Sequence, residues 1–169
     1  MGQNIGAKKT KRAEKITKIS ITVSFIMLTI IGIITFLLAN KLSTLFIPND
    51  KTAIQASALF IKIIALSFGF IGIQMSLSGL FRGSGNTLDS MFLSLFSLWI
   101  LKIPLAYFLS QYLFSSEIGI WLAFPLTNII VAMVGLFWFK RGGWKNKKLT
   151  KEINFSKRIL EETLIEDIK

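Results

Sequence analysis

The chain has 169 residues, neither cysteine nor histidine, and a formal net charge of +11. The lack of thiols and imidazoles excludes disulfides, the usual zinc ligand sets and any catalytic pair of a nucleophile with histidine, so we expect neither an enzyme nor a cofactor. Hydrophobic residues make up 52% of the chain and the mean hydropathy is +0.60, which is high for a soluble domain. This composition favours a membrane protein whose positive charge faces anionic lipid rather than nucleic acid.

Four apolar runs follow one another along the sequence. Residues 19–40 carry no charge, residues 54–81 and 90–112 carry one lysine each, and residues 118–139 are again uncharged. A bilayer core about 30 Å thick is crossed by about 20 helical residues. We therefore predict an all-α membrane protein with four transmembrane helices at these positions.

Basic residues predict how the runs are oriented. They are concentrated in residues 1–18, in the loop around Arg82 and in the segment 142–169, whereas the two opposite loops contain only Lys41 and Lys51. Positive charge near helix ends stays on the cytoplasmic side. We expect a multi-pass protein of the plasma membrane with both termini cytoplasmic. Trp144 is expected to anchor at the interface, and the tail is either an amphipathic helix on the inner surface or a solvated segment.

A stripe of small residues marks the second run, and its members recur at steps of four and three: Ala65, Gly69, Gly72, Ser76 and Gly79. Such a stripe lets another helix backbone approach closely, so it predicts a packing surface. The alternative is a flexible face that rocks against a neighbouring bundle. Lys62, one turn earlier, is expected to extend toward the outer headgroups.

Lys102 lies about a dozen residues from either end of the third run, where a charge costs roughly 2.5–3.5 kcal/mol on insertion scales. Pro104 frees backbone carbonyls one turn earlier, which can accept hydrogen bonds from the ammonium. Trp99 lies one turn away on the same face, so it is the expected cation–π partner of Lys102. Two interpretations stay open. Lys102 is either a structural clamp to carbonyls or headgroups, or a residue facing a water-filled pathway.

Two amides also lie within the runs. Gln74 in the second run and Asn128 in the fourth, which follows Pro125 and Thr127, are expected to bond to a neighbouring helix, with substrate contact as the alternative. All nine carboxylates fall outside the interiors of the four runs. A coupling proton or sodium ion normally needs a buried carboxylate, and these runs offer none.

Five stretches, in the same order and spacing, resemble the C-terminal part of a multidrug and toxic compound extrusion (MATE) transporter: residues 2–15, 79–91, 99–110, 119–130 and 138–149. The resemblance implies the last four helices of the second six-helix bundle. It assigns two sets of residues to cytoplasmic loops, one with Gly2, Gln3, Asn4 and Gly6 and the other with Gly83, Gly85 and Thr87. It also assigns Lys102 and Pro104 to a motif in the third run, where lysine replaces the usual arginine.

The function that the resemblance implies is the C-terminal segment of a cation-coupled multidrug efflux antiporter, with cationic or amphipathic substrates. The coupling ion, a proton or sodium, would bind outside this chain, and the missing N-terminal part would be its partner. We expect no transport by the chain alone. Two alternatives are part of a related flippase for lipid-linked sugars, and a small four-span structural or regulatory subunit that binds its partner through the stripe of small residues.

Overall fold

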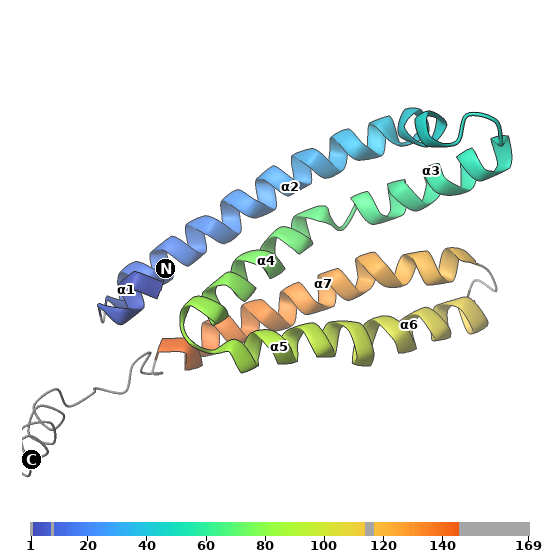
Figure 1. Cartoon of the computed structure of the whole chain (residues 1–169). Helices are drawn as coiled ribbons and strands as arrows, with labels where there is room; N and C mark the ends of the chain where they lie inside the picture. The colour runs from blue at the N-terminus through green and yellow to red at the C-terminus, as the bar shows by residue number, and fades with distance from the viewer. Residues whose placement is uncertain (1, 8, 114–116, 146–169) are drawn as a thin grey trace, which may run out of the picture.

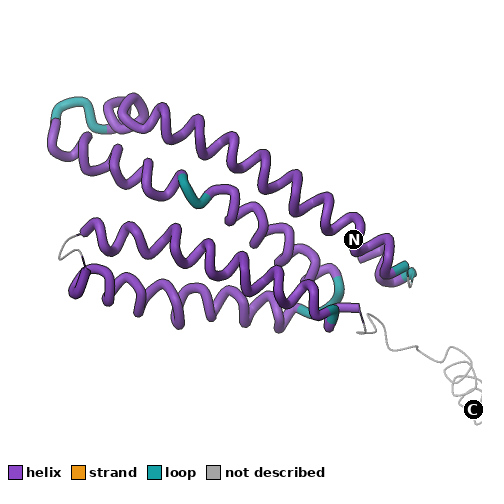
Figure 2. The backbone as a smooth tube through the Cα atoms, turned by 180° about the vertical axis from the view of Figure 1, so that it is seen from behind, coloured by secondary structure: helices purple, strands orange, loops and turns teal. Residues whose placement is uncertain are grey.

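The computed structural model describes residues 2–7, 9–113 and 117–145, and every regular element in these ranges is a helix (Figures 1 and 2). The predicted tail beyond residue 145 lies outside the described residues. The elements are α1 (Gly2–Gly6), α2 (Thr10–Phe46), α3 (Lys51–Ala65), α4 (Phe68–Gly83), α5 (Thr87–Leu95), the π-helix η1 (Phe96–Lys102), α6 (Ile103–Phe108), the π-helix η2 (Leu109–Leu113), α7 (Glu117–Arg141) and the 3-10 turn η3 (Gly143–Lys145).

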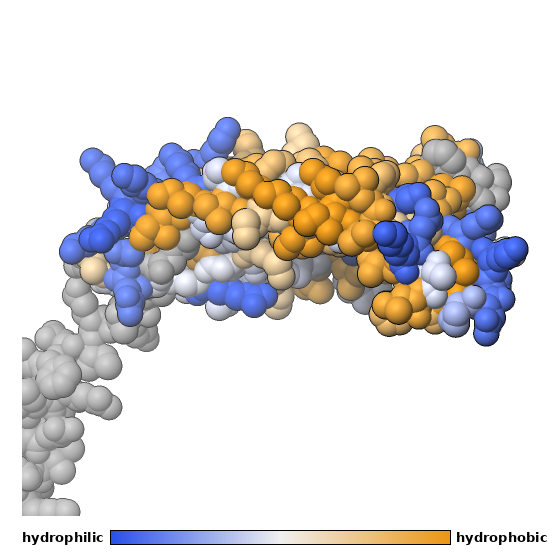
Figure 3. Space-filling view, turned by 90° about the horizontal axis from the view of Figure 1, so that it is seen from above, coloured by the Kyte–Doolittle hydropathy of each residue, from blue (hydrophilic) through white to orange (hydrophobic). Residues whose placement is uncertain are grey.

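The helices confirm the expected all-α class. Three stretches are long and apolar enough to cross a membrane: Thr10–Phe46, Thr87–Leu113 and Glu117–Arg141. A fourth is possible only if α3 and α4, which meet at an angle of 50°, count as one broken span. Large apolar side chains such as Leu37 and Phe46 are 73% and 80% exposed. Figure 3 shows this apolar surface between two hydrophilic ends, as expected where lipid surrounds the helices.

The helices lie side by side: α4 runs antiparallel to α2 and parallel to α7, and α7 runs antiparallel to the stretch from α5 to η2 (Figure 1). α2 packs against α3 and α4, α4 packs against α7, and α7 packs against the stretch from η1 to η2 (Figures 1 and 2). As a result α1, the start of α2, the loop between α4 and α5, and the end of α7 gather at one end, which we call the basic end (residues 2–7, 9–18, 82–87 and 140–145). The turn before α3 lies at the other end, where the Asp50 carboxylate caps the helix by accepting from the N–H of Thr52 and Ala53.

The prediction of one continuous helix over residues 54–81 is wrong. α3 ends at Ala65, and the chain bends at Leu66 and Ser67. Both the backbone N–H and the hydroxyl of the fully buried Ser67 donate to the carbonyl of Ile64, at 2.9 and 2.8 Å. This local turn replaces the regular helical bonds, and serine is a residue that commonly competes with the helix in this way.

The stripe of small residues faces α2 of the same chain. A Cβ atom at Gly72 would lie 2.6 Å from the carbonyl oxygen of Ser24, and one at Gly69 would overlap Thr29. Ser76 continues the contact by donating to the hydroxyl of Ser24 at 3.0 Å. Ala65 lies in α3, with its carbonyl against Gly32, and Gly79 has no atom near its would-be Cβ. The bend therefore divides the stripe, and α2 of the same chain covers Gly69 and Gly72.

A core at the basic end joins the first and last helices. Trp144 is only 1% exposed, stacks on Phe139 with ring centroids 5.8 Å apart, and donates its indole N–H to the Phe139 carbonyl at 3.1 Å. It packs in a cluster with residues of α1, α2, α4 and α7, including Ile5, Ala13 and Leu80. The expectation that Trp144 is an interfacial anchor is wrong, because its ring is buried inside the protein.

An ion pair reinforces this core. Glu14, in the polar part of α2 before the apolar run, accepts from Lys145 at 2.6 Å and pairs with Lys18 at 2.9 Å. The hydrogen bonds from Lys145 and Lys18 lower the pKa of Glu14 to about 2. Its carboxylate is therefore charged at any physiological pH, and the contribution of the pair to stability is lost only as the pH falls from about 4.5 toward 2.

Gly72→Leu tests the close approach of α2 and α4. The new side chain must displace the α2 backbone, and overpacking of this kind typically costs about 1–3 kcal/mol. We expect a lower midpoint of thermal unfolding, measured by circular dichroism in one detergent. Gly79→Leu is the matched control, since the same side chain enters open space in the same helix. Equal midpoints for the two variants would contradict the packing described here.

Candidate functional site

A group of three polar side chains bridges the bend and α7, and we call it the clasp (Ser67, Gln74 and Asn128). The Asn128 side-chain amide donates to the Ser67 hydroxyl at 3.0 Å. The Gln74 amide donates to the backbone carbonyl of Asn128 at 2.9 Å. The clasp thus ties the bend and α4 to α7, and its bonds satisfy polar groups that would be costly in an apolar medium.

A polar cleft of about 300 Å³ opens beside the clasp, between α4, the stretch from α5 to η1, and α7. We call it the serine cleft. Its apolar walls come from Ile71, Met75, Leu93, Leu98 and Val131. Its polar lining comes from Gln74, Ser78, Ser90, Ser94, Ser97 and Lys102. Ser90, Ser94 and Ser97 are four and three residues apart, which puts their hydroxyls on one helix face.

Hydrogen bonds at the basic end of the cleft meet on Ser90. Its hydroxyl lies 2.7 Å from that of Ser78 and accepts from Nε of Arg82 at 3.2 Å. Ser94 donates to the Ser90 carbonyl at 3.0 Å. Arg82 therefore brings a fixed positive charge to the end of the cleft nearest the basic end.

Lys102 lines the same cleft. Its ammonium lies 4.8 Å from the centroid of the Phe124 ring in α7 and has no carboxylate within ion-pair distance among the described residues. The aromatic partner is thus Phe124 rather than Trp99, which is 63% exposed. Pro104 lies at the start of α6, directly after the π-helix that ends at Lys102. Irregular helix of this kind often occurs at functional sites.

The loops named by the resemblance meet at the basic end. A Cβ atom at Gly2 would lie 3.1 Å from the carbonyl oxygen of Gly83, so α1 rests on the end of α4. Gly85 has a φ of 75°, a conformation that glycine adopts easily, and Thr87 begins α5. Gln3, Asn4 and Gly6 belong to α1. None of these residues lines the serine cleft.

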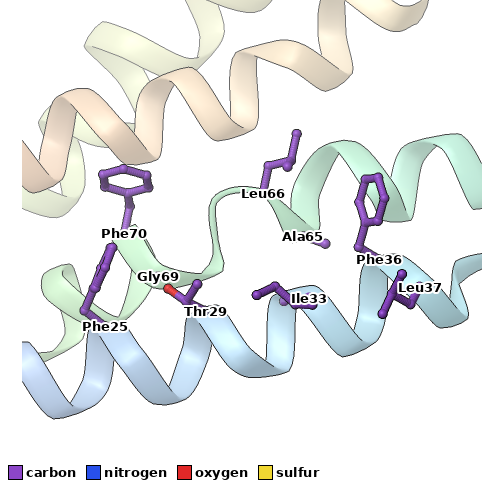
Figure 4. A pocket seen from close by; sticks show the side chains of 10 residues that line it. Phe25, Thr29, Ile33, Phe36, Leu37, Ala65, Leu66, Gly69 and Phe70 are labelled. Atoms are coloured by element: carbon purple, nitrogen blue, oxygen red, sulfur yellow. The ribbon is translucent and has the colours of Figure 1, made fainter.

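Two further grooves flank α2. One, of about 380 Å³, is lined by Ser20, Ser24, Met75, Ser76 and Gly79, and Met75 separates it from the serine cleft. The other, of about 280 Å³, lies where the bend meets α2 and is walled by Phe25, Phe36 and Phe70 (Figure 4). Its lining is almost wholly apolar, so it offers no specific site for a polar ligand. Lys62 lies outside both, 5.9 Å from the Phe36 ring centroid.

The structure brings Gln74, Asn128 and Lys102 together around α7, and adds residues that the sequence analysis missed. The sequence analysis used Arg82 only to orient the helices and assigned no site role to it, to Ser67 or to the serines of α5 and η1. The spacing of Ser90, Ser94 and Ser97 within an apolar run is a signal that could have identified the serines. The buried hydroxyl of Thr127 has no partner in the described part of the chain. No group of three carboxylate ligands that could hold a metal is found among the described residues.

A double-mutant cycle on Ser67→Ala and Asn128→Ala tests the clasp. Side-chain hydrogen bonds between membrane helices average about 0.6 kcal/mol and reach about 1.7 kcal/mol. We expect a coupling free energy in this range, measured by unfolding in mixed micelles, because each single variant removes the same bond. Spin labels can be attached through Gln55→Cys and Gly79→Cys, because the natural chain has no cysteine. In the Ser67→Ala and Asn128→Ala variants, the distance between these labels across the bend should be more broadly distributed than in the natural chain. Additive single effects would contradict the contact.

A sequence profile of the MatE family matches residues 1–108. A probable multidrug resistance protein NorM of Thermotoga maritima is 32% identical over 72% of this chain, and probable multidrug resistance proteins YoeA and YpnP of Bacillus subtilis are 25% and 28% identical over 89% of it. The chain spans only 26%, 32% and 33% of the length of these three relatives. No solved structure is significantly similar to it. The match over most of the chain confirms the resemblance seen in the sequence, and the protein belongs to the MatE family of multidrug and toxic compound extrusion transporters.

Proposed function

We propose that this chain is the C-terminal four-helix part of a cation-coupled multidrug efflux antiporter, and that it transports only together with the remaining helices. The proposal rests on the alignment of this chain with about a quarter to a third of the length of each of several probable multidrug resistance proteins. Alternating access requires two halves that move around a common site, and four helices are too few to provide both.

The polar grooves support this incompleteness. The serine cleft and the Ser20–Ser24–Ser76 groove open at the surface of the four-helix unit, at positions flanked by apolar helix. Hydroxyl, amide and ammonium groups exposed to hydrocarbon would each lose hydrogen bonds to water. These faces therefore need either further protein or a water-filled cavity against them. A transporter in which this unit forms one wall of a central cavity meets that need.

The coupling ion is proposed to bind outside this chain. Among the described residues, the carboxylates of Glu14, Asp50 and Glu117 lie at helix ends, and Asp89 lies in the first turn of α5. A cation held within the membrane normally needs a carboxylate nearby. The bend between α3 and α4, held by the clasp, is the element of this unit best suited to change shape during transport.

The alternative of a regulatory subunit that binds its partner through the stripe of small residues loses its main support. Gly69 and Gly72, the members of the stripe that allow closest approach, contact α2 of the same chain. A partner would have to displace α2 to reach them.

A chimera tests the proposed function. The segment of the Thermotoga maritima relative that matches this chain is replaced by the chain itself, and ethidium efflux is followed in a bacterial strain without its own efflux pumps. We expect ionophore-sensitive efflux from the chimera and none from the chain expressed alone. The chimera carrying Gly72→Leu should lose activity, because the new side chain displaces the α2 backbone. Efflux by the chain alone would refute the proposal, as would a folded but inactive chimera.

Single cysteines test the proposed orientation. The natural chain contains no cysteine, so Asn49→Cys at the turn before α3 and Thr87→Cys at the basic end give clean labels. With both termini cytoplasmic, a membrane-impermeant maleimide should label Asn49→Cys in intact cells and Thr87→Cys only after the cells are opened. The reverse pattern would overturn the orientation.

A further inference from the structure

We propose that the serine cleft binds the anionic group of an amphipathic solute, most simply a carboxylate, with Lys102 as its counter-ion. This inference rests on the proposed function, because it names the chemistry of a solute that this wall of the transporter would recognise. It departs from the cationic substrates that the family resemblance implies.

Charge is the first argument. Lys102 lines the cleft, Arg82 donates to Ser90 at its basic end, and no lining residue carries a negative charge. The carboxylates of Glu14 and Asp50 are already used, one by two lysines and the other as a helix cap. The Phe124 ring offers Lys102 a favourable quadrupole but does not neutralise its charge. A cation within an apolar helix therefore lacks an anion, and a ligand can supply it.

Hydrogen-bond donors give the second argument. Ser94 and Ser97 lie on the stretch of helix between Ser90 and Lys102, and all of them line one cleft. The Ser97 hydroxyl makes no hydrogen bond to another described residue, so it remains free to donate. The Ser94 proton is already donated to the Ser90 carbonyl, so the Lys102 ammonium and the Ser97 hydroxyl are the available donors. They match a carboxylate, whose two oxygens only accept hydrogen bonds. The Lys102 ammonium repels a cationic solute.

The size and walls of the cleft give the third argument. Its volume of about 300 Å³ is at the lower end for small-molecule sites, so it holds a head group with a short adjoining segment. Ile71, Leu98 and Val131 surround the polar groups with apolar surface. This combination favours a solute with one charged group and an apolar body.

The test compares two probes that differ in charge. The full chain is placed in phosphatidylcholine nanodiscs and titrated with 11-(dansylamino)undecanoate or with its trimethylammonium counterpart, and empty discs give the background. We expect the carboxylate to bind at least about tenfold more tightly, as charge-assisted hydrogen bonds require. Equal affinities, tighter binding of the cation, or no binding above empty discs would overturn the proposal.

Variants locate the effect. Lys102→Gln should abolish the preference and Lys102→Arg should retain it, whereas the matched control Lys62→Gln, whose lysine lies beside Phe36 away from the cleft, should leave it unchanged. An unchanged preference in Lys102→Gln would overturn the assignment to this cleft. If that variant does not fold, the comparison of the two probes on the natural chain still shows whether the protein prefers a carboxylate to a cation.

A third arm separates a solute from a lipid headgroup. Replacing part of the phosphatidylcholine with phosphatidylglycerol should leave the affinity for the carboxylate within about twofold once surface charge is screened by salt. Full competition by phosphatidylglycerol would assign the cleft to a lipid phosphate and overturn the solute assignment. Ethidium efflux by the chimera does not depend on this preference, so a negative binding result leaves the proposed function standing.

Discussion

The cost of leaving a polar group unpaired in hydrocarbon governs this structure. A hydroxyl, amide or ammonium within the apolar runs is costly when it has neither a partner nor water, because lipid tails offer neither donor nor acceptor. The bend at Ser67, the clasp and the bonds around Ser90 all meet this demand inside the chain. Lys102 has an aromatic ring beside it but no anionic partner among the described residues. The missing partner is what makes the serine cleft a candidate site.

The packing and the polar groups are linked through α4. One face of this helix approaches α2 through Gly69 and Gly72, so that backbone contacts backbone. Its other face carries Gln74 and Ser78 toward α7 and the serine cleft. The small residues fix the position of α4, and α4 in turn fixes the depth at which the cleft lies between its neighbours.

The apolar runs of the sequence were enough to predict the helical class, since their length and lack of charge leave few other structures. The bend was not predicted, because Ser67 and its neighbours are all tolerated within a membrane helix, and only the contact with Asn128 shows what the break is for. The partner of Lys102 was missed for a similar reason. Spacing along one helix pointed to Trp99, whereas Phe124 approaches from a helix that the sequence cannot place. Patterns along the sequence predicted local structure, whereas contacts between distant segments could be identified only from the three-dimensional structure.

The ion pair at the basic end bears on how the protein is built. Glu14 and Lys145 are 131 positions apart, so their contact forms only after α7 has been made. Until then Lys18 is the ion-pair partner of Glu14 among the described residues. A ribosome that stalls before α7, or a gene cut short there, would yield a chain without this closure. In such a chain Glu14 would keep Lys18 but lack Lys145, and the start of α2 would not be tied to the end of α7.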